Sequence, residues 1–167
     1  MNIVGLGQAG CNIAEILSQY PQYNIFKIDA DIEGDFDFIN QHEESEKSIK
    51  TYSVERQSGP EEYEQNAPSM KAFFGDIEGE TLFIIGGSGY ISAMCLRIMQ
   101  QIKDKCEISV LYVRPDTSLL SRNKALHEKS TFKVLQEFAR SGLLKMIYLV
   151  SNINLENILG EVPIIGY

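Results

Sequence analysis

A glycine-rich stretch near the amino end, Gly5-Leu6-Gly7-Gln8-Ala9-Gly10-Cys11-Asn12, holds the residues best suited to chemistry. It follows the apolar pair Ile3-Val4 and leads into a helical pattern, which predicts a strand, a tight turn and a helix. Glycines let backbone N–H groups approach a ligand, and the start of a helix adds further N–H groups and a positive dipole end. In this context the GxGxxG spacing predicts a phosphate site. The alternative is a strand-to-helix turn that only needs glycine.

A second unit of the same kind follows the apolar run Thr81–Ile85. Here the turn is Gly86-Gly87-Ser88-Gly89, and the next segment has one apolar face typical of a helix. That face consists of Ile91, Met94, Cys95, Ile98 and Ile102. Two phosphate-type turns in one small domain favour a phosphate-bearing ligand. The alternative is that these glycines only allow a helix and a strand to pack closely.

Hydrophobic patterning predicts the remaining elements. Strands are expected at Asn24–Asp29, Ile108–Val113 and Met146–Val150, with a short edge strand at Ile49–Val54. The first helix should have an apolar face made of Ile13, Ile16, Leu17 and Tyr20. Another helix should run from Pro60 toward Met70, with a bend or end at Pro68. A further helix should start near Ser121, face inward with Phe132, Leu135 and Ala139, and end at Arg140 before Gly142. This alternation predicts an α/β fold, a doubly wound and mostly parallel Rossmann-like sheet with helices on both faces.

Five groups of residues should meet at one edge of that sheet, because ligands of such folds bind outside the carboxyl ends of the strands. They are Gly5–Asn12, Asp29, Gly86–Gly89, Arg114–Asp116 and Asn152. Asp29 stands about where dinucleotide-binding folds place the acidic residue that contacts a ribose hydroxyl; a solvated carboxylate is the alternative. His42 and His127 are not expected on this edge.

The composition and net charge of the chain argue against several classes of protein. The 167 residues are expected to form a single domain, 1–167, and the net charge of −8 argues against nonspecific binding to nucleic acid or to anionic membranes. The expected first strand begins at Asn2 and no apolar run reaches the length of a membrane span, so neither a signal peptide nor a transmembrane segment is expected. Cys11, Cys95 and Cys106 have no disulfide or zinc spacing, which favours reduced thiols in the cytoplasm.

Residues 31–48 are the most polar part of the chain, and a polar surface excursion is expected over 31–57. Its carboxylates lack the spacing of a calcium loop, so no metal-ligating residues are predicted there.

Three motifs resemble those of the tubulin and FtsZ superfamily. Gly7-Gln8-Ala9-Gly10-Cys11-Asn12-Ile13 is similar to the first phosphate loop of tubulins, and Gly86-Gly87-Ser88-Gly89 resembles the signature Gly-Gly-Gly-Thr-Gly-(Ser/Thr)-Gly. Asn152, followed by Leu155, resembles the base-contacting loop of FtsZ. The order and spacing of elements agree over nearly the whole chain. The resemblance implies the cytoplasmic guanine-nucleotide-binding domain of a cytoskeletal, polymer-forming GTPase.

The resemblance also implies roles for individual residues. The α- and β-phosphates of GTP or GDP would be surrounded by Gly7, Gln8, Ala9, Gly10 and Asn12, and the loop at the β- and γ-phosphates would consist of Gly86, Gly87, Ser88, Gly89 and Tyr90. The γ-phosphate would be sensed by Ser58 and Gly59. Pro115 and Asp116 would lie near the ribose, and Asn152 would contact the guanine. Mg²⁺ would be held largely by phosphates and water.

The chain departs from the family pattern at several positions. Ile85, Tyr90 and Ile91 replace the first glycine and the closing Thr-Gly of the signature, and Leu119 stands where FtsZ-like proteins offer an acidic residue to the ribose. Tyr167 lies about where the central helix of the family would begin, ahead of the loop that completes hydrolysis on a neighbouring subunit. We therefore expect little hydrolysis by this chain alone, and filaments only with a longer chain.

Two other classes of function remain open. One is a Rossmann-type protein that binds NAD or FAD, favoured by the first glycine turn and Asp29. The other is a nucleotide-free interaction module of the same fold, favoured by Tyr90 and Ile91.

Overall fold

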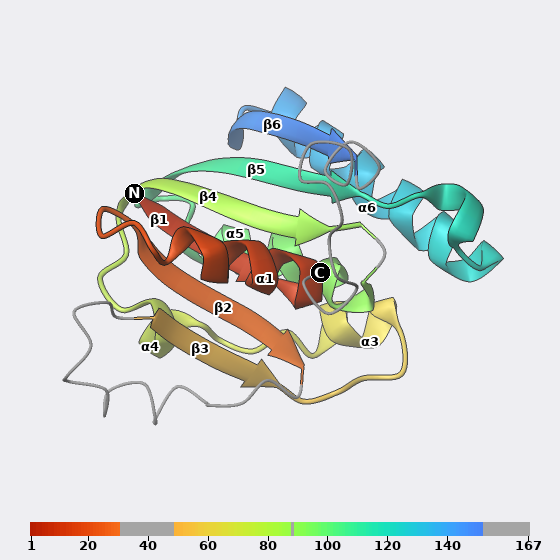
Figure 1. The fold of residues 1–167 in the computed structure, drawn as a ribbon, viewed down its shortest axis with the longest axis horizontal. Coiled ribbons are helices and arrows are strands. Elements are labelled where there is room, and N and C mark those ends of the chain that lie inside the picture. Colours follow the sequence, from red (N-terminus) through yellow and green to blue (C-terminus); the bar gives the residue numbers. More distant parts are fainter. Residues whose placement is uncertain (31–48, 88, 152–167) are drawn as a thin grey trace.

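The computed structural model describes residues 1–30, 49–87 and 89–151 of the chain (Figure 1). The elements in order are β1 (Asn2–Leu6), α1 (Gly7–Leu17), β2 (Asn24–Ala30), β3 (Ile49–Val54), α3 (Pro60–Gln65), α4 (Lys71–Phe74), β4 (Gly79–Gly86), the 3₁₀ helix η1 (Tyr90–Met94), α5 (Cys95–Ile102), β5 (Cys106–Arg114), the 3₁₀ helix η2 (Thr117–Leu119), α6 (Arg122–Arg140) and β6 (Leu144–Ser151).

All six strands form one parallel sheet in the order β3-β2-β1-β4-β5-β6. The chain first winds outward from β1 through β2 to β3, and then crosses to the other side of β1 and winds through β4 and β5 to β6. The prediction of a doubly wound α/β sheet is therefore confirmed. The winding direction reverses between β1 and β4, and this point is where ligands bind in sheets of this kind.

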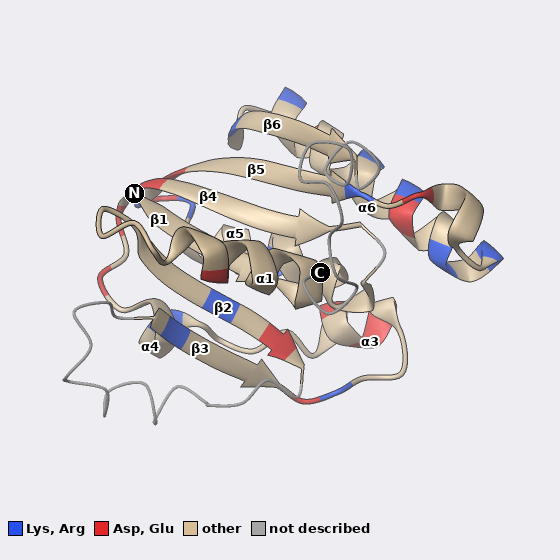
Figure 2. Cartoon of the chain, in the orientation of Figure 1, with Lys and Arg blue, Asp and Glu red and all other residues tan. Residues whose placement is uncertain are grey.

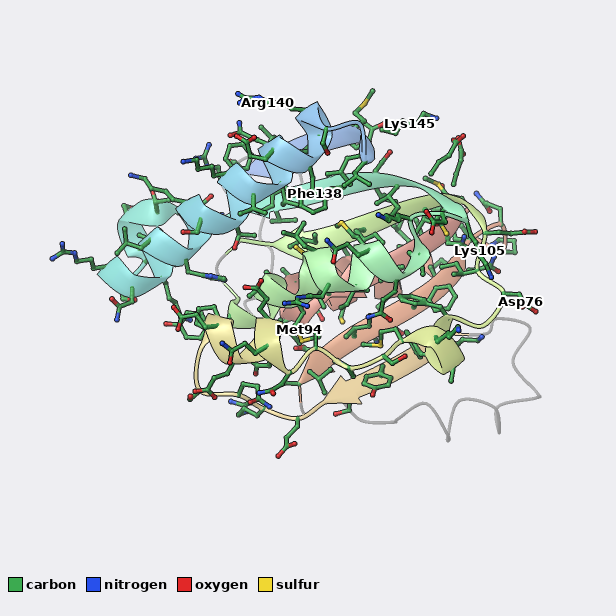
Figure 3. All side chains as sticks on the ribbon, turned by 180° about the vertical axis from the view of Figure 1, so that it is seen from behind. Asp76, Met94, Lys105, Phe138, Arg140 and Lys145 are labelled. Carbon is green, nitrogen blue, oxygen red and sulfur yellow. The ribbon has the colours of Figure 1, made fainter. Side chains whose placement is uncertain are left out.

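The two faces of the sheet are covered by different helices. α1 packs on one face, where Ala14 contacts inward residues such as Ile3, Ile25 and Ile84. α3, α4, η1, α5 and α6 contribute side chains to the larger cluster on the opposite face. Figure 3 views this second face and shows the helices in front of the sheet. Because the central strands β1 and β4 are covered on both sides, they appear in the sequence as nearly continuous apolar runs.

The helix after the second glycine turn buries the side chains that its pattern predicts. Ile91, Met94, Cys95, Ile98 and Ile102 are all at most 6% exposed. In α6, Leu135 is buried, and Phe132 and Ala139 pack against the same cluster, as expected. None of the described helices is long and apolar enough to cross a membrane.

The prediction for the buried face of the first helix is wrong in part. Ile16 is 54% exposed, and Tyr20 lies beyond the end of α1 at 50% exposed. The residues of α1 that are buried are Gly7, Gly10, Cys11 and Ala14. Small residues make the closest contact because α1 lies directly against the sheet, while Ile13 and Leu17 are half-buried and pack against the same cluster.

The helix from Pro60 and the edge strand at Ile49–Val54 are present as expected, and the structure gives their bounds. α3 ends at Gln65, before Pro68, and does not reach Met70. A proline removes an N–H donor and disfavours a helical residue before it, so the break comes early. Within the range 31–57, residues 49–54 form the edge strand β3 that its apolar pattern favours, while 31–48 lie outside the described residues.

We expect Gly10→Ala to destabilise the fold strongly. A Cβ at Gly10 would overlap the carbonyl oxygen of Ile84 in β4, and backbone atoms on both sides cannot yield as a flexible side chain would. Overpacking of this kind should lower the free energy of unfolding by at least about 2 kcal/mol. Urea unfolding followed by circular dichroism measures the change.

Gly59→Ala is the matched control for this substitution. No atom lies within 4 Å of a Cβ at Gly59, and its φ of −159° suits any residue. This variant should lose less than about 1 kcal/mol. Equal losses in the two variants would contradict the packing explanation.

Candidate functional site

The two predicted glycine turns lie on either side of the point where the winding of the sheet reverses. β1 ends at Leu6 and is followed at once by α1, and β4 ends at Gly86 and is followed by the turn that leads into η1. Because β1 and β4 are hydrogen-bonded neighbours with Leu6 opposite Ile85, the two turns are neighbours as well. The sheet thus brings together the two segments whose glycines predict a phosphate site.

The glycines of the first turn have different roles. A Cβ at Gly5 would overlap the carbonyl oxygen of Gly10 and lie 2.9 Å from the Cβ of Ala14, so Gly5 and Gly10 allow α1 to pack against the sheet. Gly7 has a φ of 78°, a conformation that favours glycine, and it begins α1. Gln8 is exposed and Ala9 is half-buried. Gly7 and the first backbone N–H groups of α1 are therefore the part of this turn that a ligand could use.

Asn12 carries a polar atom that lacks a partner. Its side-chain Nδ2 is buried and has no hydrogen-bond partner among the described residues. An amide donor removed from water without an acceptor costs about 1–3 kcal/mol, so buried donors are usually satisfied. An acceptor supplied by a bound ligand would satisfy this one.

The second turn is fixed through its backbone. The carbonyl oxygen of Gly86 accepts a hydrogen bond from the hydroxyl of Ser92, and the N–H of Gly87 donates to the carbonyl oxygen of Val113 over 3.1 Å. At its far end, the carbonyl oxygen of Gly89 lies 2.9 Å from Nε2 of His127. The predicted site residue Ser88 lies outside the described residues. The described part of this turn is tied to β5, η1 and α6, and so has a defined position.

The side chain of Ile91 lies close to both turns. A Cβ at Gly7 would lie 3.0 Å from Cγ2 of Ile91, and one at Gly89 would lie 3.9 Å from the same atom. A Cβ at Gly86 would lie 3.1 Å from the Cβ of Ala9, so the turns also approach each other directly. A bulky apolar side chain therefore lies close to both turns.

Ser58 and Gly59 lie at the start of α3, which packs against η1. With Tyr90 and His127 they help to line a cavity of about 600 Å³ between α3, η1, α5 and α6. The hydroxyl of Ser58 donates to Glu62 over 2.6 Å, and the N–H of Ser58 lies 3.4 Å from the other oxygen of that carboxylate. The structure thus brings this predicted loop next to the second glycine turn, and Ser58 is engaged within the loop.

The predicted carboxylates stand at the ends of their strands. Asp29 lies near the end of β2, where one of its oxygens accepts a hydrogen bond from the N–H of Ala30 over 2.8 Å. Asp116, which follows Pro115 after β5, accepts from both the N–H and the hydroxyl of Ser118 and caps η2. In this structure the carboxylate of Asp116 is thus used to cap the turn that it begins. Asn152 lies outside the described residues, so its predicted contact with a base stays a prediction.

His127 was expected away from this edge, and that expectation is wrong. Its ring contacts Gly89 and packs edge-on against Tyr90, with ring centroids 5.4 Å apart. α6 starts near the carboxyl end of β5, so its first two turns must pass beside the second glycine turn. The short connection from β5 to α6 could therefore have assigned His127 and the adjacent Glu128 to the site. His42 lies outside the described residues.

Glu128 is the centre of a buried polar cluster beneath the second glycine turn. Its side chain is 1% exposed, and its Oε1 accepts a hydrogen bond from the hydroxyl of Tyr112 over 3.1 Å. The Nε of Arg114 lies 3.3 Å from the same oxygen. Oε2 is buried and has no hydrogen-bond partner among the described residues. Burial, and then the carboxylate of Glu128, raise the pKa of Tyr112, so the phenol stays protonated and acts as a donor.

Cys11 and Cys95 are buried thiols and are therefore poorly placed to react. Burial raises the pKa of Cys11 to about 12 and that of Cys95 to about 12, so both stay protonated thiols near neutral pH. Among the described residues, no group of three or more histidines, cysteines and carboxylates is placed to hold a metal ion.

No protein-family model matches the sequence, and no curated protein matches it at a significant level.

Thiol labelling should separate the three cysteines of the folded protein. At pH 8, Cys11 and Cys95 are buried and carry pKa values of about 12, so they should resist iodoacetamide, whereas the partly exposed Cys106 should react. Mass spectrometry should find a single alkyl group on the native protein and three after unfolding in guanidinium. Rapid labelling of Cys11 in the native protein would contradict the described packing of α1.

Proposed function

We propose that this chain is a nucleotide-binding domain, and that its ligand is a guanine nucleotide bound as in the tubulin and FtsZ superfamily. The observation that carries the proposal is the position of both glycine turns at the point where the sheet order β3-β2-β1-β4-β5-β6 reverses. Ligands of open parallel sheets bind at this point. A phosphate-bearing ligand is favoured because each turn leads into a helix, and Gly7 and the first backbone N–H groups of α1 lie at this point.

The electrostatics of the first turn support a phosphate as the ligand. The N-terminal N–H groups of α1, an eleven-residue helix, have no intrahelical acceptor, and they lie at the positive end of the helix dipole. The unsatisfied Nδ2 of Asn12 is an additional donor on the same helix. Such a local set of donors can hold an anion within a protein of net charge −8. In this proposal Mg²⁺ is bound chiefly by the phosphates and by water.

The preference for guanine rests on the resemblance. Asn152 and Ser88, to which the resemblance gives contacts with the base and the phosphates, lie outside the described residues. Self-association into filaments, and GTP hydrolysis across a filament contact, belong to the same proposal. Both would require parts of the family architecture beyond this domain.

A dinucleotide such as NAD is a second candidate, and Asp29 favours it. This carboxylate lies near the end of β2, the strand beside β1, where dinucleotide-binding folds contact a ribose hydroxyl. A nucleotide-free interaction module is a third candidate, and the side chain of Ile91 between the turns favours it.

Ligand-dependent thermal stability tests these candidates. The melting temperature of the purified protein should rise with GTP and with GDP in the presence of Mg²⁺, and not with ATP or NAD. A ligand that binds only the folded state stabilises it, by about 2.7 kcal/mol at a hundred times its Kd. A rise with NAD alone would identify the dinucleotide site instead. The absence of a rise with any ligand at millimolar concentration would favour the interaction module.

Shortening Ile91 should improve nucleotide binding. Ile91→Ala removes Cγ2, the atom nearest to a Cβ position at Gly7, and so opens the space between the two turns. We expect GTP to bind about tenfold more tightly, a gain of about 1.4 kcal/mol, although the unliganded protein loses stability. Isothermal titration calorimetry measures the Kd.

Ile98→Ala is the control for the general cost of a core truncation. Ile98 is fully buried on α5, away from the turns. It should lose stability without any change in Kd. Unchanged or weaker GTP binding by Ile91→Ala would mean that Ile91 does not obstruct the site.

A further inference from the structure

We propose that Arg114 binds the phosphate groups of the nucleotide, and that Glu128 is a positioning residue that holds Arg114 in place for this contact. The inference rests on the proposed function, since it assigns a further binding residue to the same site.

The position of Arg114 follows from the pairing of β4 with β5. Gly86 pairs with Val113, and the N–H of Gly87 donates to the carbonyl oxygen of Val113. Arg114 is the next residue and the last of β5, so its backbone stands at the carboxyl edge beside the second glycine turn. Figure 2 shows basic residues at this end of β5 and on the neighbouring α6.

The guanidinium of Arg114 is held from two sides. Its Nε lies 3.3 Å from Oε1 of Glu128, and its central carbon lies 5.0 Å from the ring centroid of Phe132. Both partners belong to α6. The side chain of Arg114 is nevertheless 45% exposed, and neither of its Nη nitrogens has a hydrogen-bond partner among the described residues. The group is therefore oriented, yet most of its donors remain available.

The pairing with Glu128 is not the arrangement that would best stabilise an ion pair. Arg114 presents one nitrogen to one oxygen, whereas arginine and carboxylate commonly pair through two parallel hydrogen bonds. A buried carboxylate with one unsatisfied oxygen is costly, and apolar residues often stabilise such a position as well or better. The planar guanidinium matches the geometry of phosphate, and holding it in place before binding reduces the entropy lost on binding. The geometry thus fits an orienting role for Glu128.

α6 also fixes the second glycine turn relative to Arg114. His127 contacts the carbonyl oxygen of Gly89, and a Cβ at Gly87 would lie 3.1 Å from Cγ of Glu128 and would overlap the hydroxyl of Tyr112. His127 and Glu128, which are consecutive in α6, therefore contact the second glycine turn, and Glu128 also contacts Arg114. Arg114 is thus connected to the second glycine turn through Glu128, which contacts both.

The test compares ligands with and without phosphate. Arg114→Gln should weaken the binding of Mg-GTP at least tenfold while leaving the weak binding of guanosine, which has no phosphate, unchanged. Arg114→Lys should lie between the wild type and Arg114→Gln, because lysine keeps the charge but not the planar donor set. Arg140→Gln is the matched control, since Arg140 is exposed in the last turn of α6 and should not affect either ligand.

Glu128→Gln tests the positioning role. The amide oxygen can still accept from Tyr112 and Arg114, so the fold should persist while the charge that orients the guanidinium is lost. GTP binding should weaken about threefold, and its dependence on salt should stay as in the wild type, because Arg114 keeps its charge. In Arg114→Gln, by contrast, the salt dependence should decrease.

The failures of the two proposals are distinguishable. If the wild type binds GTP and Arg114→Gln binds it equally well, the role of Arg114 is overturned and the proposed function stands. If Arg114→Gln loses GTP and guanosine to the same extent along with thermal stability, Arg114 is only structural and the inference is again overturned. If the wild type binds no nucleotide, both proposals are overturned.

Discussion

The close approach of α1 to the sheet is the constraint on which the rest of the architecture depends. Gly5 and Gly10 let the backbone of the helix lie against the backbones of β1 and β4, where no side chain fits. This contact fixes the start of α1 beside the end of β4, and hence beside the second glycine turn. Because strands of a parallel sheet end at one edge, the carboxyl ends of β2, β3 and β5 lie along the same edge as this contact. The geometry of the candidate site thus depends on one helix whose buried face consists of glycines and other small residues.

Much of this fold could be predicted from the sequence, because apolar runs and glycine turns report local conformation directly. The six described strands follow from apolar runs, and the buried face shared by η1 and α5 follows from helical periodicity. The face of α1 could not be read in the same way, since Gly10 and Ala14 have little hydrophobicity and the more apolar Ile16 lies outside the contact. Hydrophobic periodicity reveals a buried helix face when large apolar side chains form it. It does not reveal a face such as that of α1, which is formed by small residues.

The site was less predictable than the fold. The position of the two turns follows from the sheet order, but the contacts of His127, Glu128 and Arg114 join residues that are remote in sequence, up to 38 positions apart for His127 and Gly89. The close approach of Ile91 to Gly7 likewise depends on how η1 packs against the first turn. A single sequence identifies the types of residue that approach an edge; which of them touch is decided by packing.

The glycines of this chain also bear on how such a site would change over evolutionary time. Gly5, Gly10 and Gly87 are each required because a Cβ would overlap a neighbouring atom, whether or not a ligand is ever bound. A lineage that lost its ligand would therefore keep the glycine fingerprint under selection for folding alone. Gln8, Asn12 and Arg114 have no comparable steric constraint and would drift. In chains of this fold, the polar positions around the turns are consequently the better record of ligand binding, and the glycines are chiefly a record of the fold.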